Sequence, residues 1–164
     1  MAREANSDEL WRSPIHLLHR AGQCAENVFQ SEMGDRDLTP RQLAILMAVA
    51  EDEGASQTGL VERTGIDRST LADLVHRLQR KHLLQRRRKK EDARTYAIKL
   101  TNEGRRVLRA AEPLAKRVDQ RVLDALPNKQ RDQFMGALVS IVDTLQELSS
   151  EVTGVVRGAR KRDA

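Results

Sequence analysis

The chain has 164 residues, of which 32% are charged and only 2% are aromatic, and its net charge is +5. A core with so few aromatic side chains must be aliphatic, which favours helices over a β-sandwich. No apolar run approaches the roughly 18 residues of a membrane span, and the first residues lack a signal-peptide core, so we expect a cytoplasmic protein without a membrane partner.

The first predicted element is a helix over residues 7–34. Ser13 and Pro14 provide a second start inside it, because proline suits the first helical turn. Apolar residues recur at the three- and four-residue spacings that place them on one side of a helix. These residues are Ile15, Leu18, Gly22, Ala25 and Phe29.

Three further helices are predicted in close succession. Residues 38–54 begin with Thr39 as the N-cap of a capping box. A short helix over residues 56–65 and a longer helix over residues 66–82, capped by Asp67, follow with almost no linker. Two helices joined by a turn that contains glycine are typical of a helix-turn-helix.

A hairpin is predicted directly after the fourth helix. Residues 83–88 and 94–100 are two short runs, the second with alternating apolar side chains, joined by a polar segment. Nine lysines and arginines against two acids lie between residues 77 and 94, which gives this part +7 and the rest of the chain −2. Solvated charged surfaces normally mix signs. A hairpin directly after a helix-turn-helix makes a winged helix-turn-helix. Its concentrated positive charge suits double-stranded DNA.

Two helices complete the chain. The first, over residues 101–126, begins at Thr101 and is expected to bend at Pro113, which lacks a backbone donor. The second begins at Pro127, and its apolar residues alternate between spacings of four and three, as in a helix-pairing seam. The seam residues are Phe134, Leu138, Ile141, Leu145 and Leu148.

We interpret residues 1–164 as one domain that is mainly α with a small β-hairpin wing. The winged helix-turn-helix core needs only residues 39–101. The helices at residues 8–33 and 101–149 are surplus to that core and are expected to pair with a second copy, because a two-fold DNA reader requires a dimer. Residues 155–164 are expected to be a disordered tail.

At this point the sequence resembles the MarR family of bacterial winged-helix regulators. The resemblance covers residues 13–148 and rests on "LTPRQLAILMAVAE", "GLVERTGIDRSTLADLVHRLQRKHLLQRR" and "EDARTYAIKLTNEGR". The family's wing signature, Asp-x-Arg followed by Leu-Thr-x-x-Gly, is met from Asp92 to Gly104. The resemblance implies a homodimer joined through its N- and C-terminal helices, which represses transcription from palindromic operators until a small effector binds.

The resemblance also implies roles for single residues. Ser69 and Thr70 would contact DNA at the start of the reading helix and Arg77 would contact a phosphate. Arg94 would enter the minor groove, held by a charge-assisted bond from Asp92. The basic run from residue 86 to residue 90 is expected to meet phosphates. The full predicted DNA-binding set is Arg68, Ser69, Thr70, Asp73, His76, Arg77, Arg86, Arg87, Arg88, Lys89, Lys90, Asp92 and Arg94.

The reading helix departs from the family pattern in its middle. Ala72 and Asp73 stand where many relatives have threonine and arginine, and His76 stands where an acid is common. Asp73 can accept a hydrogen bond from a cytosine amino group or pair with Arg77 one turn on, and we favour the pairing.

The first helix bears on the effector. "SPIHLLHRAGQ" resembles more loosely the branch of the family that regulates the catabolism of aromatic acids such as hydroxycinnamates, some members sensing a coenzyme A thioester. Polar residues recur at three- and four-residue spacings and are interpreted as a stripe beside the apolar one, next to the second helix. The predicted effector residues are His16, His19, Arg20, Gln23, Asn27 and Arg41.

Several alternatives are weighed against this interpretation. Cys24, the only cysteine, allows a peroxide sensor, but the sequence has one tyrosine to stabilise a thiolate, so we interpret Cys24 as a small buried packing residue. His16 and His19 have a metal-compatible spacing without acids or cysteines beside them, so no metal or other cofactor is expected. The sequence contains no catalytic motif that would indicate an enzyme. A sequence-neutral DNA-binding protein is the remaining alternative, and it would bind all duplexes alike.

Overall fold

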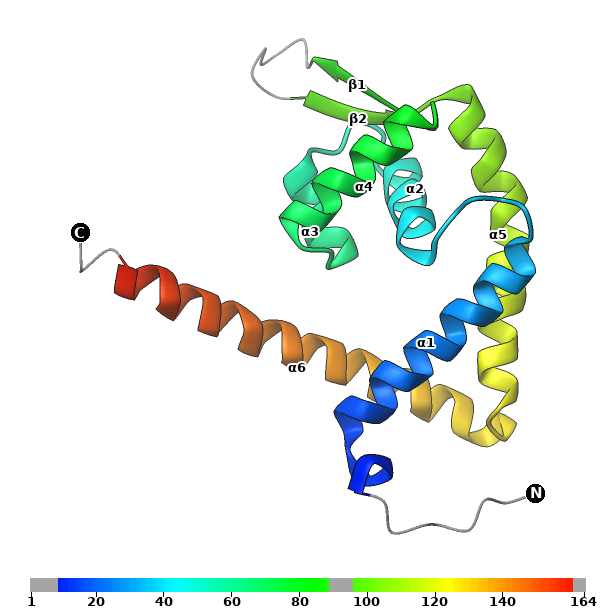
Figure 1. The fold of residues 1–164 in the computed structure, drawn as a ribbon, viewed down its shortest axis with the longest axis vertical. Coiled ribbons are helices and arrows are strands. Elements are labelled where there is room, and N and C mark those ends of the chain that lie inside the picture. Colours follow the sequence, from blue (N-terminus) through cyan, green and yellow to red (C-terminus); the bar gives the residue numbers. More distant parts are fainter. Residues whose placement is uncertain (1–8, 89–95, 161–164) are drawn as a thin grey trace. The chain divides into compact units, whose positions relative to one another are not determined.

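A computed structural model describes the backbone of residues 9–88 and 96–160, and the side chains of residues 9–87 and 96–149. A one-turn 3-10 helix, Glu9–Arg12, comes first. Figure 1 shows the elements that follow, which are α1 (Pro14–Met33), α2 (Pro40–Glu51), α3 (Gln57–Thr64), α4 (Arg68–Arg80), β1 (Leu84–Arg88), β2 (Tyr96–Leu100), α5 (Asn102–Asp124) and α6 (Asn128–Arg160). This order confirms a mainly helical winged helix-turn-helix with a two-stranded hairpin.

The helices begin where the sequence signals place them. Ser13 caps α1 and accepts a hydrogen bond from the His16 backbone N–H at 3.3 Å, so the internal start is the real one. Thr39 and Gln42 form the reciprocal capping box of α2, with hydrogen bonds of 3.3 and 3.1 Å. Thr101 caps α5 by accepting from the Gly104 N–H at 2.9 Å. α5 then continues through Pro113 as one helix.

The chain divides into two compact units, the first ending at residue 119 and the second beginning at residue 120. The core of the first unit is aliphatic, as the composition requires. It is formed by residues of the end of α1, the three helices α2 to α4, the hairpin and α5. Its most completely buried side chains are Met33, Leu38, Ile45, Leu46, Val49, Leu60, Leu71, Val75, Leu78, Ile98 and Leu100.

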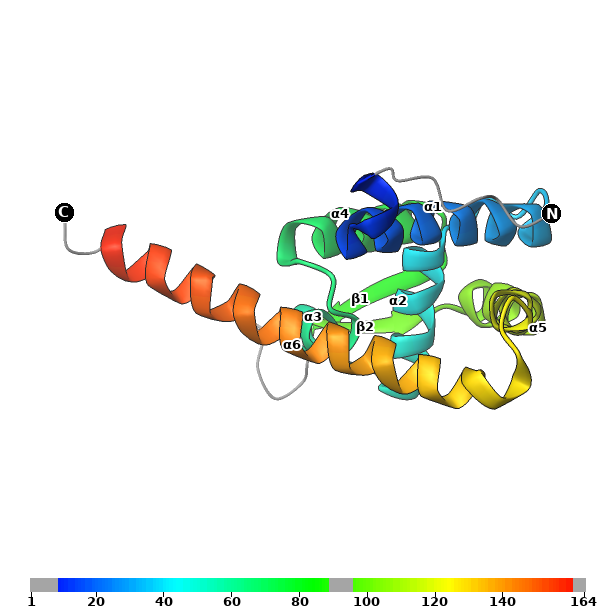
Figure 2. The ribbon, with the colours of Figure 1, turned by 90° about the horizontal axis from the view of Figure 1, so that it is seen from below.

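The hairpin is fixed to the helices through its second strand. β1 and β2 pair antiparallel with Leu84 opposite Leu100 and Arg86 opposite Ile98. Ile98 also exchanges backbone hydrogen bonds of 3.1 Å with Gly54 and Ala55 in the connection between α2 and α3. β2 lies next to α2 (Figure 1 and Figure 2). The hairpin therefore has a defined place beside the helix-turn-helix.

The second unit contains the end of α5 and all of α6. Arg131 of α6 pairs with Asp124 of α5 at 2.9 Å and donates to the Leu126 carbonyl oxygen at 3.2 Å, which fixes the turn between the two helices. Large apolar side chains along α6 are exposed in the single chain. They are Met135, Val139, Ile141, Val142, Leu145 and Leu148.

The C-terminal end of α6 and the apolar stripe of α1 complete the description of the helices. The disorder expected from residue 155 stays a prediction for the tail, and residues 161–164 lie outside the described residues. α6 itself is a helix to Arg160. Extending an existing helix adds one hydrogen bond for each residue fixed, whereas starting one is costly. The apolar stripe of α1 is buried only near its C-terminal end, since Phe29 is buried but Ile15 is 79% exposed.

Candidate nucleic-acid interface and ligand groove

The start of α4 is ordered by Asp67. The Asp67 carboxylate accepts from the Thr70 N–H at 2.9 Å and from the Ser69 hydroxyl at 2.6 Å. These hydrogen bonds, the one from Ser69 first, hold the pKa of Asp67 well below its usual range. Arg68 donates to the Thr58 hydroxyl at 3.3 Å and so links α4 to α3. The first turn of the predicted reading helix is therefore firmly placed.

One side of α4 is exposed along its whole length. Leu71, Val75 and Leu78 are buried, while the opposite side is exposed. The exposed residues include Arg68, Ser69, Asp73, His76, Arg77 and Arg80. An exposed helix side of this kind is what enters the major groove of DNA. The predicted contact residues of α4 therefore lie together, apart from the half-buried Thr70.

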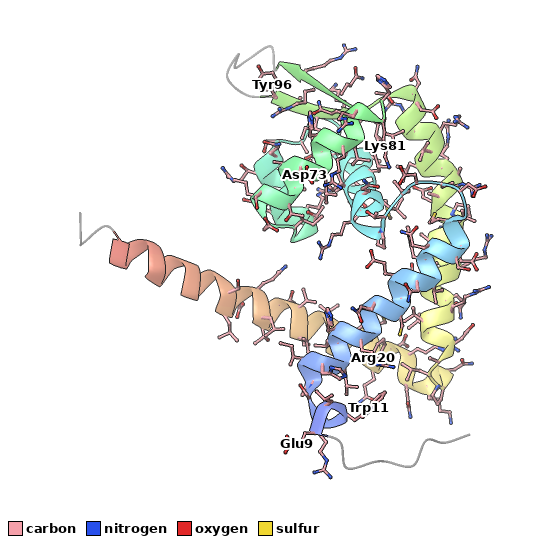
Figure 3. All side chains as sticks on the ribbon, viewed as in Figure 1. Glu9, Trp11, Arg20, Asp73, Lys81 and Tyr96 are labelled. Atoms are coloured by element: carbon pink, nitrogen blue, oxygen red, sulfur yellow. The ribbon has the colours of Figure 1, made fainter. Side chains whose placement is uncertain are left out.

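Asp73 and Arg77 form the expected pair. The Arg77 Nε lies 2.9 Å from the Asp73 Oδ2, and both side chains are more than half exposed. An exposed pair of this spacing contributes little to stability. Its effect is to occupy the carboxylate of Asp73, which is labelled in Figure 3, and so to orient the Arg77 guanidinium on the exposed side of α4.

The hairpin adds basic side chains to this region. Arg86 and Arg87 are exposed, and the Arg86 guanidinium carbon lies 5.0 Å from the centre of the Tyr96 ring on β2. Arg87 donates to the Gln85 side chain at 3.4 Å. The side chain of Arg88 and all of Lys89, Lys90, Asp92 and Arg94 lie outside the described residues. Tyr96 was not predicted as a partner of the basic run, although strand alternation puts the two on one side of the hairpin.

A groove of about 530 Å³ lies between α1, α2 and α5. Its lining is largely apolar, with two acids and one lysine. The lining residues are Phe29, Pro40, Leu43, Ala44, Met47, Glu112, Ala115, Lys116, Val118 and Asp119. A second hollow of about 420 Å³ shares Pro40 and Ala44 with it and extends past Arg41 to the turn before α4. The volume of the groove is in the range of small-molecule sites.

The structure does not gather the six predicted effector residues into one pocket. Arg41 lines the hollow beside the turn that precedes α4. His16 is half-buried, and the other four lie exposed on α1: His19, Arg20, Gln23 and Asn27. Successive residues of an α-helix are rotated by about 100°, so the polar stripe points to the side of α1 opposite Phe29. Phe29 is the residue of α1 that lines the groove. Our placement of the stripe beside the apolar one is therefore wrong.

The N-terminal half of α1 has its own contacts. The Arg20 guanidinium lies over the Trp11 ring, 5.4 Å from its centre, and both are labelled in Figure 3. Cys24 is exposed in this chain, so its interpretation as a buried packing residue is wrong here. The reason is that α1 packs on its own chain only near Phe29 and Met33. Among the described residues, no group of three or more His, Cys, Asp or Glu side chains is arranged to hold a metal ion.

The groove residues were missed by sequence reasoning because they come from three helices far apart in the chain. One signal was available. Arg41, Ala44 and Met47 recur every three residues on the exposed side of α2, and a large apolar side chain there, Met47 at 40% exposure, is unexpected for solvated surface.

Comparison with known proteins identifies the architecture. Residues 36–95 match the sequence model of the MarR family. The transcriptional regulator HosA of Escherichia coli O127:H6 is 32% identical over 130 residues, which cover 79% of this chain and 95% of HosA. The chain belongs to the MarR family.

Solved MarR-fold structures agree over most of the chain. PcaV of Streptomyces coelicolor, solved in complex with its natural ligand, has a TM-score of 0.76 and 33% identity, covering 85% of this chain and 97% of PcaV. BpsR of Bordetella bronchiseptica, whose DNA binding is regulated by 6-hydroxynicotinic acid, has a TM-score of 0.73 and 27% identity, covering 80% of this chain and 94% of BpsR.

Membership of the MarR family makes this protein a transcriptional regulator and not an enzyme. Within residues 9–88 and 96–160, none of the helices has the length and apolar character needed to cross a bilayer. The winged helix-turn-helix is the DNA-binding module of the MarR family, and α4 is the second helix of the helix-turn-helix in this chain.

Proposed function

We propose that this MarR-family protein is a repressor that binds a palindromic operator as a homodimer and is released by a small aromatic acid or its coenzyme A thioester. The observation that carries the DNA-binding part is the exposed side of α4 beside the basic hairpin. We assign base contacts to the first two turns of α4 and phosphate contacts to Arg77 and the basic run. Arg94, guided by Asp92, is proposed to enter the minor groove.

The homodimer is supported by apolar surface that one chain leaves in water. Leu10, Ile15 and Leu18 are exposed at the start of the chain, and α6 exposes six large apolar side chains. Exposed apolar area of this extent is typical of a protein–protein interface. Two reading helices in such a dimer would meet half-sites about 34 Å apart.

The groove between α1, α2 and α5 supports an aromatic effector. Phe29, Met47 and the neighbouring aliphatic side chains suit an aromatic ring, and Lys116 offers a cation for a carboxylate. Arg41 lies in the adjoining hollow and is a second candidate cation. BpsR, regulated by 6-hydroxynicotinic acid, shows that this ligand chemistry occurs in a protein of the same fold.

The polar stripe on α1 of one protomer is proposed to meet the effector that is bound to the other protomer. His16, Arg20 and Asn27 point away from Phe29, so they do not line the groove of their own chain. A partner's α1 packed on the apolar surface would bring such a stripe to the junction between protomers, where His19 and Gln23 could also contribute hydrogen bonds.

The effector assignment is tested by comparing two single substitutions. Release of DNA by an aromatic acid is measured for Lys116→Ala and Arg20→Ala. If the groove holds the carboxylate, Lys116→Ala keeps DNA affinity but needs at least about tenfold more acid for release, which corresponds to about 1.4 kcal/mol of binding free energy. Normal release of both variants would place the effector elsewhere.

The exposure of Cys24 supports one alternative, a thiol-sensing repressor. An exposed thiol is accessible to peroxide, as a redox sensor requires. The comparison of wild type with Cys24→Ser separates the two proposals. Loss of DNA binding on mild oxidation of the wild type alone would favour the thiol sensor, whereas equal DNA binding of both proteins after oxidation favours the small-molecule effector.

A further inference from the structure

The C-terminal end of α4 is tied to a distant loop. Lys81, the C-cap residue of α4, places its Nζ 2.8 Å from the Asp37 Oδ2 and also contacts the Asp37 carbonyl oxygen. Lys81 is labelled at that end of α4 in Figure 3. The Lys81 side chain is only 30% exposed, whereas that of Asp37 is 89% exposed. The ammonium group thus has two acceptors in one loop, and most of its stem is covered.

The loop that holds Lys81 joins two walls of the ligand groove. Phe29, near the end of α1, lines the groove, and so does Pro40, the first residue of α2. The loop between these helices is itself anchored, because Leu38 is buried and Arg36 donates to the Met33 carbonyl oxygen. A ligand that changes the spacing of α1 and α2 must therefore move the loop that contains Asp37.

The ion pair with Asp37 distinguishes Lys81 from the other cations of α4. Arg77 and Arg80 are exposed, and Arg77 is oriented by a residue of its own helix. Neither Arg80 nor Lys81 is among the DNA-binding residues predicted above, but both belong to the basic patch between residues 77 and 94. An exposed cation of that patch, such as Arg80, is expected to meet a phosphate. From the sequence alone, the same would be expected of Lys81. In the structure its charge is directed to Asp37 instead.

We propose that Lys81 is a positioning residue and not a phosphate contact. It holds the DNA-reading helix to the loop between two groove walls, and the Asp37–Lys81 pair transmits the binding of an effector in the groove to α4. The DNA-binding part of this inference stands on the contacts alone. The transmission part rests on the proposed effector function. The Asp37 side of the pair is largely exposed, and an ion pair of this kind adds little to stability, so Asp37→Ala and the stem-conserving Lys81→Met should leave the fold intact.

The DNA-binding part is tested by salt dependence. The probe is a duplex that the wild-type protein selects from a random library, and its affinity is measured by fluorescence anisotropy over a series of salt concentrations. Removing one phosphate-binding cation flattens the plot of log affinity against log salt by about one unit. Lys81→Met keeps the stem and removes the charge, and Arg80→Met is the matched control at the neighbouring position.

Arg80→Met is expected to flatten the slope by about one unit, and Lys81→Met is expected to leave it unchanged. Lys81→Met and Asp37→Ala should weaken binding by similar factors, and the double variant should bind no more weakly than either single one, because both remove the same link. A slope change for Lys81→Met equal to that of Arg80→Met would overturn the assignment. Additive effects on affinity in the double variant would also overturn it.

The transmission part is tested with 6-hydroxynicotinic acid, benzoic acid and 4-hydroxybenzoic acid. An acid that weakens wild-type DNA binding by a measurable factor should do so by at least about threefold less in Lys81→Met. Its own affinity for the DNA-free protein, measured by calorimetry, should be unchanged. An undiminished factor in the variant would contradict transmission through Asp37. If none of the acids acts on the wild type, the proposed effector class fails, while the salt series still decides the role of Lys81.

Discussion

Gly104 lies where the first turn of α5 approaches the backbone just before β1. A Cβ at this position would overlap the Leu83 carbonyl oxygen and press on Leu100. Alanine normally stabilises a helix relative to glycine. Here the overlap is with backbone, so we predict that Gly104→Ala lowers the free energy of unfolding by about 1–3 kcal/mol, measured by urea denaturation.

Gly136 of α6 provides the control for this substitution. A Cβ there would meet nothing within 4 Å. Gly136→Ala should therefore be neutral or stabilising by up to about 1 kcal/mol. Equal effects of the two substitutions would show that helix propensity, and not the contact with Leu83, governs Gly104.

His82 occupies a position that glycine usually holds. The Leu83 N–H donates to the Leu78 carbonyl oxygen and the His82 N–H to the Gln79 carbonyl oxygen, both at 2.9 Å, which is the Schellman pattern that ends a helix. His82 itself, at the centre of this pattern, has a φ of 57°, which lies in the left-handed region. We predict that His82→Gly raises the free energy of unfolding by about 0.5–1 kcal/mol, as measured by denaturation. A decrease would show that the imidazole makes a stabilising contact.

At the scale of elements, the two strands of the wing act together through Arg86 and Tyr96. The guanidinium lies over the ring face, and an arginine stacked in this way can still present its N–H edge to a phosphate. Tyr96→Phe should keep DNA affinity, because the ring face remains. Tyr96→Ala should weaken DNA binding about as much as Arg86→Ala does. The double variant should bind about as weakly as either single alanine variant, because both substitutions remove the same contact. Unchanged affinity of Tyr96→Ala would mean that Arg86 needs no support from the ring.

The starts of α2 to α5 could be predicted from the sequence, because capping depends on residues three apart. The first helix was predicted from residue 7, but α1 begins at the internal start, Pro14. Thr39 and Asp67 need only the backbone N–H groups of their own first turns. The winged core was predictable for the same reason, since its elements follow one another with short connections. Family resemblance then predicted which residues of α4 contact DNA.

The ligand groove could not be predicted in this way. Phe29, Met47 and Lys116 meet only because α1, α2 and α5 pack together, and no local spacing encodes that packing. Arg20 and Arg41 illustrate the reverse case. Both were predicted to lie at the effector site between protomers. Arg20, however, is on the side of α1 that points away from the groove and lies over Trp11, and Arg41 lines a different hollow.

At the scale of the whole molecule, the apolar side chains of α6 have a second copy as their expected partner. A chain that ends before Pro127 lacks Met135, Val139 and the rest of that surface. We predict that this truncation gives a monomer by analytical ultracentrifugation and weakens operator binding at least about a hundredfold, because a half-site binds with only part of the dimer's contacts. A truncated dimer with undiminished affinity would remove α6 from the interface.

Our central proposal is that the exposed side of α4 and the basic wing read a particular DNA sequence under the control of an aromatic acid. The most direct measurement is the ratio of dissociation constants for a library-selected duplex and for random duplex of the same length, at one salt concentration, with and without the acid. We predict a preference of roughly 10³ or more for the selected duplex without acid, and a decrease of at least about fivefold in its affinity when the acid is added. Equal affinity for the two duplexes in the absence of the acid would contradict the proposal.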